Sequence, residues 1–452
     1  MPRSHQSKPQ RHHQGFFGHR VLAATFVLAV FGWGVGFYGP PVFLHAVVAR
    51  TGWAVGLVSA AVTVHFVVGA IVVANLPRLY RRFGTPVVTF GGAVLSAAGT
   101  CGWALAQAPW QLYAAAAVSG AGWVALGAAA INALIAPWFV ARRPWALAMA
   151  YNGASMGGVV FSPLWVVLIG TLGFAQAGVV VGVAMLACLA LLCARVFSRT
   201  PERMGQAPDG GARLPASGGV SSSSASGSPG AAAPAVEPGT APRTAASASS
   251  GLAPSGPVPA AVQRWRGDRR FVTLAGAMAL GLFAQIGLIA HLYSMIAPRL
   301  GEETAGVLMG AATACAILGR TAAGWLVPAG ADRRQLACAS YGVQAVGSLV
   351  LWAGGGEPLA IWLGVALFGL GIGNATSLPP TIAQAEFARA DAQRAVPLMV
   401  AISQGGYAFA PAVFGLVREL APAGHAPARL FVAAAVLQLA AVGCMAAGRA
   451  GR

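Results

Sequence analysis

One arginine of the sequence lies where a charge is costly. Arg320 falls well inside an apolar run that extends from Leu308 to Val327. On insertion scales an arginine at the bilayer centre costs about 2.5–3.5 kcal/mol, and every acidic residue lies at the end of such a run or between two runs. Because the guanidinium fork matches a carboxylate, we expect Arg320 to bind the carboxylate of a substrate. The alternative is snorkelling to the interface, since positions 320 to 327 span only about 10 Å of helix.

Two histidines also lie within apolar runs. His65 falls near the middle of one run, and His291 falls in the outer half of another. Histidine titrates near neutral pH, so either side chain could accept a coupling proton in a segment that offers no carboxylate. The alternative is a neutral imidazole that hydrogen-bonds to a neighbouring helix.

The composition indicates that these apolar runs are embedded in lipid. Hydrophobic residues make up 57% of the 452 residues and charged residues only 9%, against about 25% charged in soluble proteins. This excludes a water-soluble enzyme, a disordered chain and a secreted disulfide scaffold. The net charge of +18 is not that of a nucleic-acid binder, because the basic residues lie in short clusters between apolar runs. The six cysteines form no CxxC pair and are interpreted as small core residues.

The apolar runs predict an all-α membrane protein with twelve transmembrane helices. A spanning helix needs about 20 mostly apolar residues. Such runs lie near 20–44, 54–76, 87–106, 110–135, 145–169, 174–197, 271–296, 304–327, 335–353, 358–384, 396–417 and 427–448. A β-barrel is excluded because its strands would alternate apolar and polar residues, whereas these runs are apolar on all sides.

Arginines between the runs predict the orientation. They concentrate in alternate loops and at the two ends of the chain, while the opposite loops hold only Arg50, Arg299, Arg418 and Arg429. By the positive-inside rule both termini are cytoplasmic, in a multi-pass protein of the cell inner (plasma) membrane. We expect a cytoplasmic tail over 1–19, six-helix bundles over 20–197 and 271–448, a linker over 198–270 and a tail over 449–452. Forty of the 50 residues in 211–260 are Ala, Ser, Gly or Pro, which predicts disorder in that linker.

The two bundles are of equal length, which suggests an internal repeat. A shift of 252 residues places Arg81 and Arg82 on Arg333 and Arg334, Arg142 on Arg394, and Asn152 on Gln404. Two six-helix halves related by an axis along the membrane normal are a transporter architecture, with the substrate site between the halves.

Four stretches of the sequence resemble the major facilitator superfamily. They are Leu79–Gly92 (LYRRFGTPVVTFGG), Arg142–Gly153 running into Ser155–Gly158, Pro201–Gly210 (PERMGQAPDG), and Arg320 with Gly324. Within the superfamily they are most similar to the branch that contains monocarboxylate transporters and oxalate–formate antiporters. Members with this arginine often carry an acid one turn before it, where this sequence has Ala316.

The resemblance implies a central cavity and a set of residues that line it. Beside Arg320, the implied substrate-binding residues are Tyr38, Asn152, Gln285, Asn374, Gln404 and Tyr407. It also implies that loops near the cytoplasm hold contacts that break and re-form as the two halves rock. The implied gating residues are Arg81, Arg82, Arg142, Arg333, Arg334 and Arg394.

We therefore expect a secondary active transporter that moves a small organic anion, a mono- or dicarboxylate, by alternating access. The chain has no GxSxG, HExxH or P-loop motif, so we expect neither an enzyme nor an ATP-driven pump. We also expect no cofactor or metal and no nucleic-acid partner, and we expect a monomer in the lipid bilayer. The alternatives are efflux of a neutral or amphiphilic compound and a membrane sensor that does not transport.

Overall fold

The computed structural model describes residues 16–210, 267–326, 332–422 and 426–449. Within these ranges the regular secondary structure is helical, with no strand. Twelve helical segments there are long and apolar enough to cross a membrane, which confirms the predicted fold class and number of spans. The glycine- and serine-rich stretch over 211–260 and most of the N-terminal tail lie outside the described residues.

The first six spans are built from eight α-helices. These are α1 (Gly18–Gly36), α2 (Gly39–Thr51), α3 (Val55–Phe83), α4 (Thr85–Leu105), α5 (Pro109–Leu126), α6 (Ala128–Ile135), α7 (Arg143–Leu172) and α8 (Phe174–Leu192), with a π-helical end to α8 over Cys193–Phe197. Together α1 and α2 form the first span, and α5 and α6 form the fourth.

The second six spans follow the same scheme. They are α9 (Arg269–Leu300), α10 (Glu302–Leu326), α11 (Arg333–Ala353), α12 (Pro358–Glu386), α13 (Arg389–Tyr407), α14 (Ala410–Glu419) and α15 (Ala426–Ala447). The eleventh span combines α13 and α14. Several helices extend beyond the predicted runs, because arginines and acids that the hydropathy pattern excludes continue the same helices into the interface.

Local sequence explains where the spans break. Pro40 and Pro41 stand at the start of α2, where proline is tolerated because the first amides of a helix have no intrahelical acceptor. Gly127 has extended backbone (φ −88°, ψ −152°) and separates α5 from α6. Pro411 lies in the first turn of α14, after the break that follows Tyr407. The first, fourth and eleventh spans are therefore each made of two helices.

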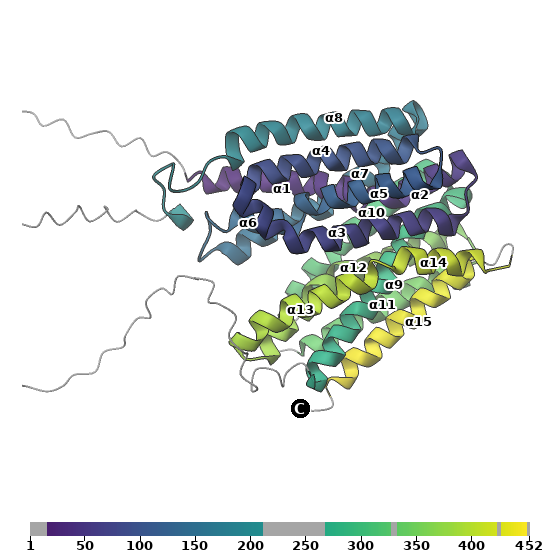
Figure 1. Ribbon diagram of the computed structural model, residues 1–452. Coiled ribbons are helices and arrows are strands. Elements are labelled where there is room, and N and C mark those ends of the chain that lie inside the picture. Colours follow the sequence, from purple (N-terminus) through teal and green to yellow (C-terminus); the bar gives the residue numbers. More distant parts are fainter. Residues whose placement is uncertain (1–15, 211–266, 327–331, 423–425, 450–452) are drawn as a thin grey trace, which may run out of the picture.

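The helices form two bundles, α1–α8 and α9–α15, that meet along one half of their length (Figure 1). We call the end where α8 finishes and α9 begins the linker side, and the opposite end the far side. Near the far side α2 packs on α9, and α14 packs on α3, while α7 runs along α10. Toward the linker side α13 diverges from α3 and α6 (Figure 1).

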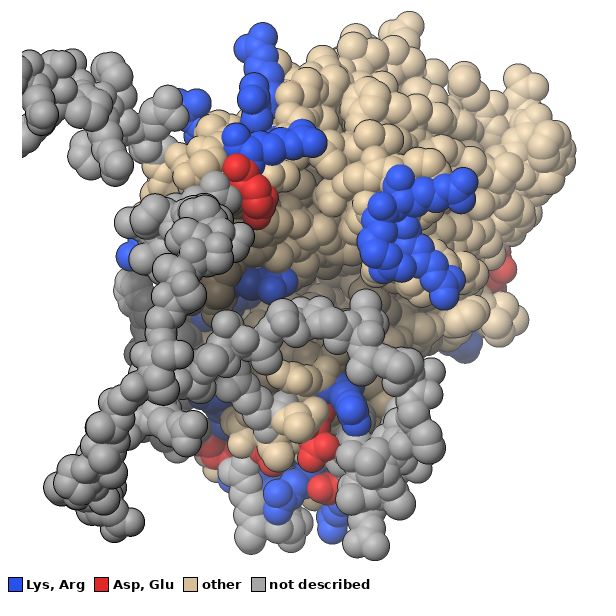
Figure 2. Space-filling view, turned by 60° about the vertical axis from the view of Figure 1, so that its left-hand side comes forward, with Lys and Arg blue, Asp and Glu red and all other residues tan. Residues whose placement is uncertain are grey.

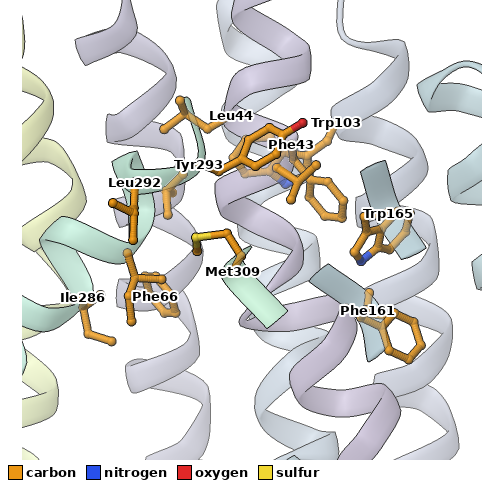
Figure 3. Close-up of a cluster of buried hydrophobic side chains, with 14 of the residues drawn as sticks. Phe43, Leu44, Phe66, Trp103, Phe161, Trp165, Ile286, Leu292, Tyr293 and Met309 are labelled. Carbon is orange, nitrogen blue, oxygen red and sulfur yellow. The ribbon is translucent and has the colours of Figure 1, made fainter. Parts of the chain in front are cut away.

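A continuous apolar core joins the bundles near the far side (Figure 3). The ring of Phe43 packs edge-on against Trp165 with 4.8 Å between centroids, and both are almost fully buried beside Trp103. Tyr293 and Met309 bring the second bundle into the same cluster. Lipid tails are as apolar as this core, so tight van der Waals packing is what holds the two bundles together here.

The segment after α8 folds back onto the first bundle. Asp209 accepts hydrogen bonds from the backbone amides of Val140, Ala141 and Arg142 at 2.8–3.1 Å. Its own amide donates to the Trp138 carbonyl at 2.9 Å. These amides precede α7 and have no intrahelical acceptor, so Asp209 fixes the loop that leads into α7.

Candidate functional site

A cavity of about 570 Å³ lies between the two bundles. Its lining comes from α1, α3, α5, α6 and α7 of the first bundle and from α9, α10, α12 and α13 of the second. Ala148, Asn152 and Thr376 line its linker-side part and are exposed. The far-side core closes the other end, so the cavity opens toward the linker side.

Arg320 projects from α10 onto the wall of this cavity. Its Nε donates to the Gly373 carbonyl on α12 at 3.3 Å. Only glycine allows α12 to approach α10 this closely, because a Cβ at 373 would lie 2.4 Å from the Ala316 backbone oxygen. Among the residues that the structure describes, no protein acceptor is found for its two terminal nitrogens, and no Asp or Glu lines the cavity. One end of the guanidinium is thus fixed, and the other faces the cavity without a counter-ion.

Tyr38 lies beside this arginine at the break between α1 and α2. Its hydroxyl is hydrogen-bonded to the side chain of Thr313 on α10, and it is close enough to Arg320 for the two to interact electrostatically. Gly158 of α7 meets the same point, since a Cβ there would lie 2.5 Å from the Tyr38 ring. Tyr38 of the first bundle therefore contacts the second bundle next to the Arg320 guanidinium.

The structure brings most of the predicted binding residues together. Tyr38, Asn152, Gln285, Arg320, Gln404 and Tyr407 all line the cavity. The side-chain oxygen of Gln285 accepts a hydrogen bond from Gln344 Nε2 at 3.4 Å. Asn152 on α7 and Gln404 on α13, which the internal repeat aligns, line the cavity from opposite bundles.

Asn374 does not belong to this set. It is buried between helices, and its amide donates to the Gly319 carbonyl at 3.3 Å. The side chain satisfies the packing of α12 on α10 and does not reach the cavity lining. The rotation of α12 thus turns Asn374 away from the cavity, and polarity alone does not determine this rotation. A role for Asn374 in binding stays a prediction.

A model of the family described as Major Facilitator Superfamily matches residues 21–411 of the sequence. The chain belongs to the major facilitator superfamily. No curated protein matches the sequence. The superfamily is therefore the level at which sequence comparison places the chain.

Solved structures of superfamily transporters share the fold. A D-xylose–proton symporter superposes with a TM-score of 0.67 at 14% identity, covering 95% of this chain and 97% of its own. The nucleoside transporter NupG, as a D323A mutant, gives 0.66 at 11% identity over 95% and 99%. A bacterial homologue of the human lysosomal transporter Spinster, inward-facing and unoccupied, gives 0.64 at 14% identity over 98% of both chains. At these identities the likeness concerns the fold alone.

The two histidines of this superfamily member lie outside the cavity lining. His65 is buried, with Nε2 2.9 Å from the Gly36 carbonyl and Nδ1 2.9 Å from Ser119 Oγ. His291 is buried with Nε2 3.0 Å from the Pro411 carbonyl. Both link neighbouring helices, as the alternative interpretation expects. Their role in proton coupling stays a prediction.

The implied gating arginines fall into two groups. Arg81, Arg82, Arg142, Arg333 and Arg394 are exposed on the linker side, and Figure 2 shows that basic side chains gather there. Arg334 is different, because it is only 1% exposed and pairs bidentately with Glu386 at 2.8 Å for both contacts. It also donates to carbonyls of α9 and α15. All its contacts lie within the second bundle.

Sequence reasoning missed the polar contacts that close the far side. Glu419 at the end of α14 accepts from the Gly56 amide, in the first turn of α3, at 2.7 Å. Thr63 Oγ1 accepts from the Ala412 amide at 3.1 Å, and His45 lies 3.5 Å from Glu302. Each contact joins one bundle to the other. Nothing in the sequence pairs residues so far apart, although an acid at a span end opposite a helix start is consistent with it.

Aromatic residues of the cavity wall were also missed. Trp33, Phe37, Phe66, Trp123 and Tyr151 line it together with the predicted polar groups. Their types gave no signal, since aromatic residues of this chain are found both exposed on the outside of spans, as at Trp110, and packed inside, as at Trp165.

Proposed function

We propose that the protein is a secondary active transporter that moves a small organic anion across the cytoplasmic membrane by alternating access. The observation that carries this proposal is the guanidinium of Arg320, held at one end by Gly373 and facing the cavity without an acidic neighbour. A charge kept in an apolar protein interior is costly unless it is paired. A carboxylate that enters the cavity supplies the missing partner, bidentately on the two terminal nitrogens.

Binding at this point links occupancy to the movement of the bundles. Arg320 and Gln285 belong to the second bundle, whereas Tyr38 and Asn152 belong to the first. A bound anion that touches both sets stabilises whichever arrangement brings them closest, and it shifts the population toward that state. The closed far side and the open linker side correspond to one end state, and rocking of the bundles produces the other.

The linker side is the cytoplasmic side in this proposal, with both termini in the cytoplasm. The arginine bias of the loops supports it. The structure is then inward-open. We assign the protein to the monocarboxylate-transporter-like and oxalate–formate-antiporter-like branch on the motifs over 79–92, 142–158 and 201–210, and we propose a monomer. Because the sequence has no P-loop, an existing gradient drives transport.

Replacement of Arg320 tests the anion site. In proteoliposomes that contain the full chain, counterflow of labelled mono- and dicarboxylates is expected to fall at least tenfold in Arg320→Gln. Arg320→Lys is expected to fall nearly as far, since a lysine loses the bidentate fork. Arg429→Gln, an exposed far-side arginine, is the matched control and is expected to leave counterflow unchanged. Unaltered counterflow in correctly inserted Arg320→Gln would falsify the anion site.

Two rival functions make different predictions in the same assay. The aromatic cavity wall favours efflux of a neutral or amphiphilic compound, in which case Arg320→Gln leaves exchange intact. A sensor that does not transport binds the compound and shifts the melting temperature, but it gives no counterflow with any variant. Measuring binding and counterflow on one preparation separates the three functions.

A further inference from the structure

The cavity combines a single positive charge with a continuous aromatic wall. Among the described lining residues Arg320 is the one charged side chain, and the polar remainder is uncharged amides, hydroxyls and phenols. The aromatic lining residues are Trp33, Phe37, Tyr38, Phe66, Trp123, Tyr151 and Tyr407. These two features together restrict the substrate more than either does alone.

The rings form a connected surface that starts at the arginine. Tyr38, beside Arg320, packs edge-on against Phe37 with 5.0 Å between centroids. Phe37 lies 6.1 Å from Phe66, and Phe66 lies 5.5 Å from Trp123 at an angle of 77°. An aromatic group whose carboxylate reached Arg320 would find ring faces and edges beside it, with no polar gap between.

Both bundles contribute to this aromatic surface, and a buried histidine packs against its outer side. Phe66 on α3 contacts Tyr407 on α13 with 6.1 Å between centroids. Trp123 on α5 stacks its rear face on the buried His65, 5.6 Å away at 23°. The His65 ring is fixed by hydrogen bonds at both nitrogens. The aromatic wall is therefore pre-organised, which lowers the entropic cost of binding a flat ligand.

The charge count limits the ligand to one carboxylate. A dicarboxylate would leave its second carboxylate without a cation, and a zwitterion would leave its ammonium without an acid among the described lining residues. Each unpaired charge is disfavoured when the bundles close around the ligand and exclude water. The volume of about 570 Å³ is in the range of pockets that enclose drug-sized ligands. Acetate or lactate would leave most of the aromatic wall uncovered.

We propose that the substrate is an aromatic monocarboxylate, with its carboxylate on Arg320 and its ring against Phe66 and Trp123. This inference rests on the proposed anion transport and narrows it from organic anions in general. It also explains why the cavity combines a cation, which suits an anion, with an aromatic wall, which suits an amphiphilic compound. The ligand is amphiphilic, and its one charge is negative.

A matched set of compounds tests the proposal on the purified full chain. The probes are indole-3-acetate, phenylacetate, phenylacetamide, acetate, succinate and tryptophan, each scored by thermal shift and by counterflow in proteoliposomes. Indole-3-acetate and phenylacetate are expected to bind at least tenfold more tightly than acetate, succinate, tryptophan or the neutral amide. If acetate or succinate exchanges as well as the aromatic acids, this proposal is overturned and anion transport stands. If no anion exchanges, the proposed function itself fails.

Variants of the aromatic wall separate recognition of the ring from recognition of the charge. Phe66→Leu and Trp123→Leu are expected to weaken indole-3-acetate binding about tenfold while acetate binding changes less than twofold. Trp110→Leu is the matched control, because Trp110 lies on α5 with Trp123 but is 69% exposed. If the Phe66 and Trp123 variants lost affinity for indole-3-acetate and acetate equally, the rings would have only a structural role. The same conclusion would follow if Trp110→Leu lost as much affinity for indole-3-acetate.

Discussion

Two arginines of the second bundle show how partners decide what a side chain does. Arg334 is fully buried, yet it contributes to packing because Glu386 pairs with it and backbone carbonyls accept its remaining donors. Arg320 is half-buried and has one backbone acceptor. A satisfied charge fixes helices, and an unsatisfied one is available to a ligand. The difference follows from the neighbours of each residue and not from its type.

Asp209 provides a pH-dependent contact outside the membrane spans. Partial desolvation raises the pKa of this carboxyl, but the amides of Ala141, Arg142 and Val140 and the charge of Arg142 outweigh it, so the pKa lies below its usual value. A depressed folded-state pKa means that the stabilisation is present above the unfolded-state pKa. It is lost as the pH falls through the folded-state pKa.

Asp209→Ala is therefore expected to expose the amides of residues 140–142 near neutral pH. Hydrogen exchange there should speed up about tenfold relative to the unsubstituted chain at pH 7, in line with loss of hydrogen bonds to a charged acceptor. The ratio should fall toward one as the pH drops below about 4, near the ordinary Asp pKa. Glu303→Ala, at an exposed acid of α10, should leave these amides unchanged. A ratio that stays constant with pH would contradict the argument.

At the scale of elements, broken spans and helix ends place the contacts between bundles. After the break that precedes α14, the last turn of α14 lies against the start of α3. There the Glu419 carboxylate accepts a hydrogen bond from the Gly56 amide. A Cβ on residue 56 would lie 2.5 Å from the Glu419 carboxylate, so a larger residue there would push that carboxylate away. An acid at a helix N-terminus is favourable, so this contact stabilises the closed far side.

Loosening that contact should open the far side more often. Ser59 is buried against α14, so in a cysteine-free background Ser59→Cys reports opening by its reaction with a membrane-impermeant thiol reagent added from the far side. Glu419→Ala is expected to raise the labelling rate about threefold, the effect of one partly exposed hydrogen bond, and Gly56→Ala should act in the same direction. Glu303→Ala again serves as the control. Unchanged labelling in both variants would show that Glu419 does not hold the closure.

For the whole molecule, the distribution of charge supports the proposed orientation. The described part of the first bundle from Phe16 to Thr200 contains no acidic residue. Its exposed arginines at 78, 81, 82, 142 and 143 lie at helix ends on the linker side, whereas the exposed Arg50 lies at the end of α2 on the far side. By the positive-inside rule, such a bias predicts that the linker side lies in the cytoplasm.

Fusions at the C-terminus test this orientation. A green fluorescent protein joined after residue 452 is expected to fluoresce, and an alkaline phosphatase joined at the same place is expected to be inactive, since each folds in only one compartment. A second pair of fusions after Ala421, between α14 and α15 on the far side, should give the opposite result. Active phosphatase at the C-terminus would place the cavity opening outside the cell.

The sequence by itself determined the fold class, the twelve spans and the position of Arg320 within one of them. These are properties of local stretches, because the length of an apolar run and the cost of a charge within it depend little on the rest of the chain. The polar residues that line the cavity were also mostly predictable, since few polar groups occur in such spans.

Only the tertiary structure decided which side of each helix faces the cavity. Asn374 and Gln404 are both amides within spans, yet one donates to Gly319 and the other lines the cavity. Trp110 and Trp123 share α5, yet one is exposed and the other forms the aromatic wall. In lipid, a helix can be apolar on all sides, so its sequence carries no hydrophobic face that would fix its rotation. The rotation is fixed by close packing between helices, which brings distant residues together.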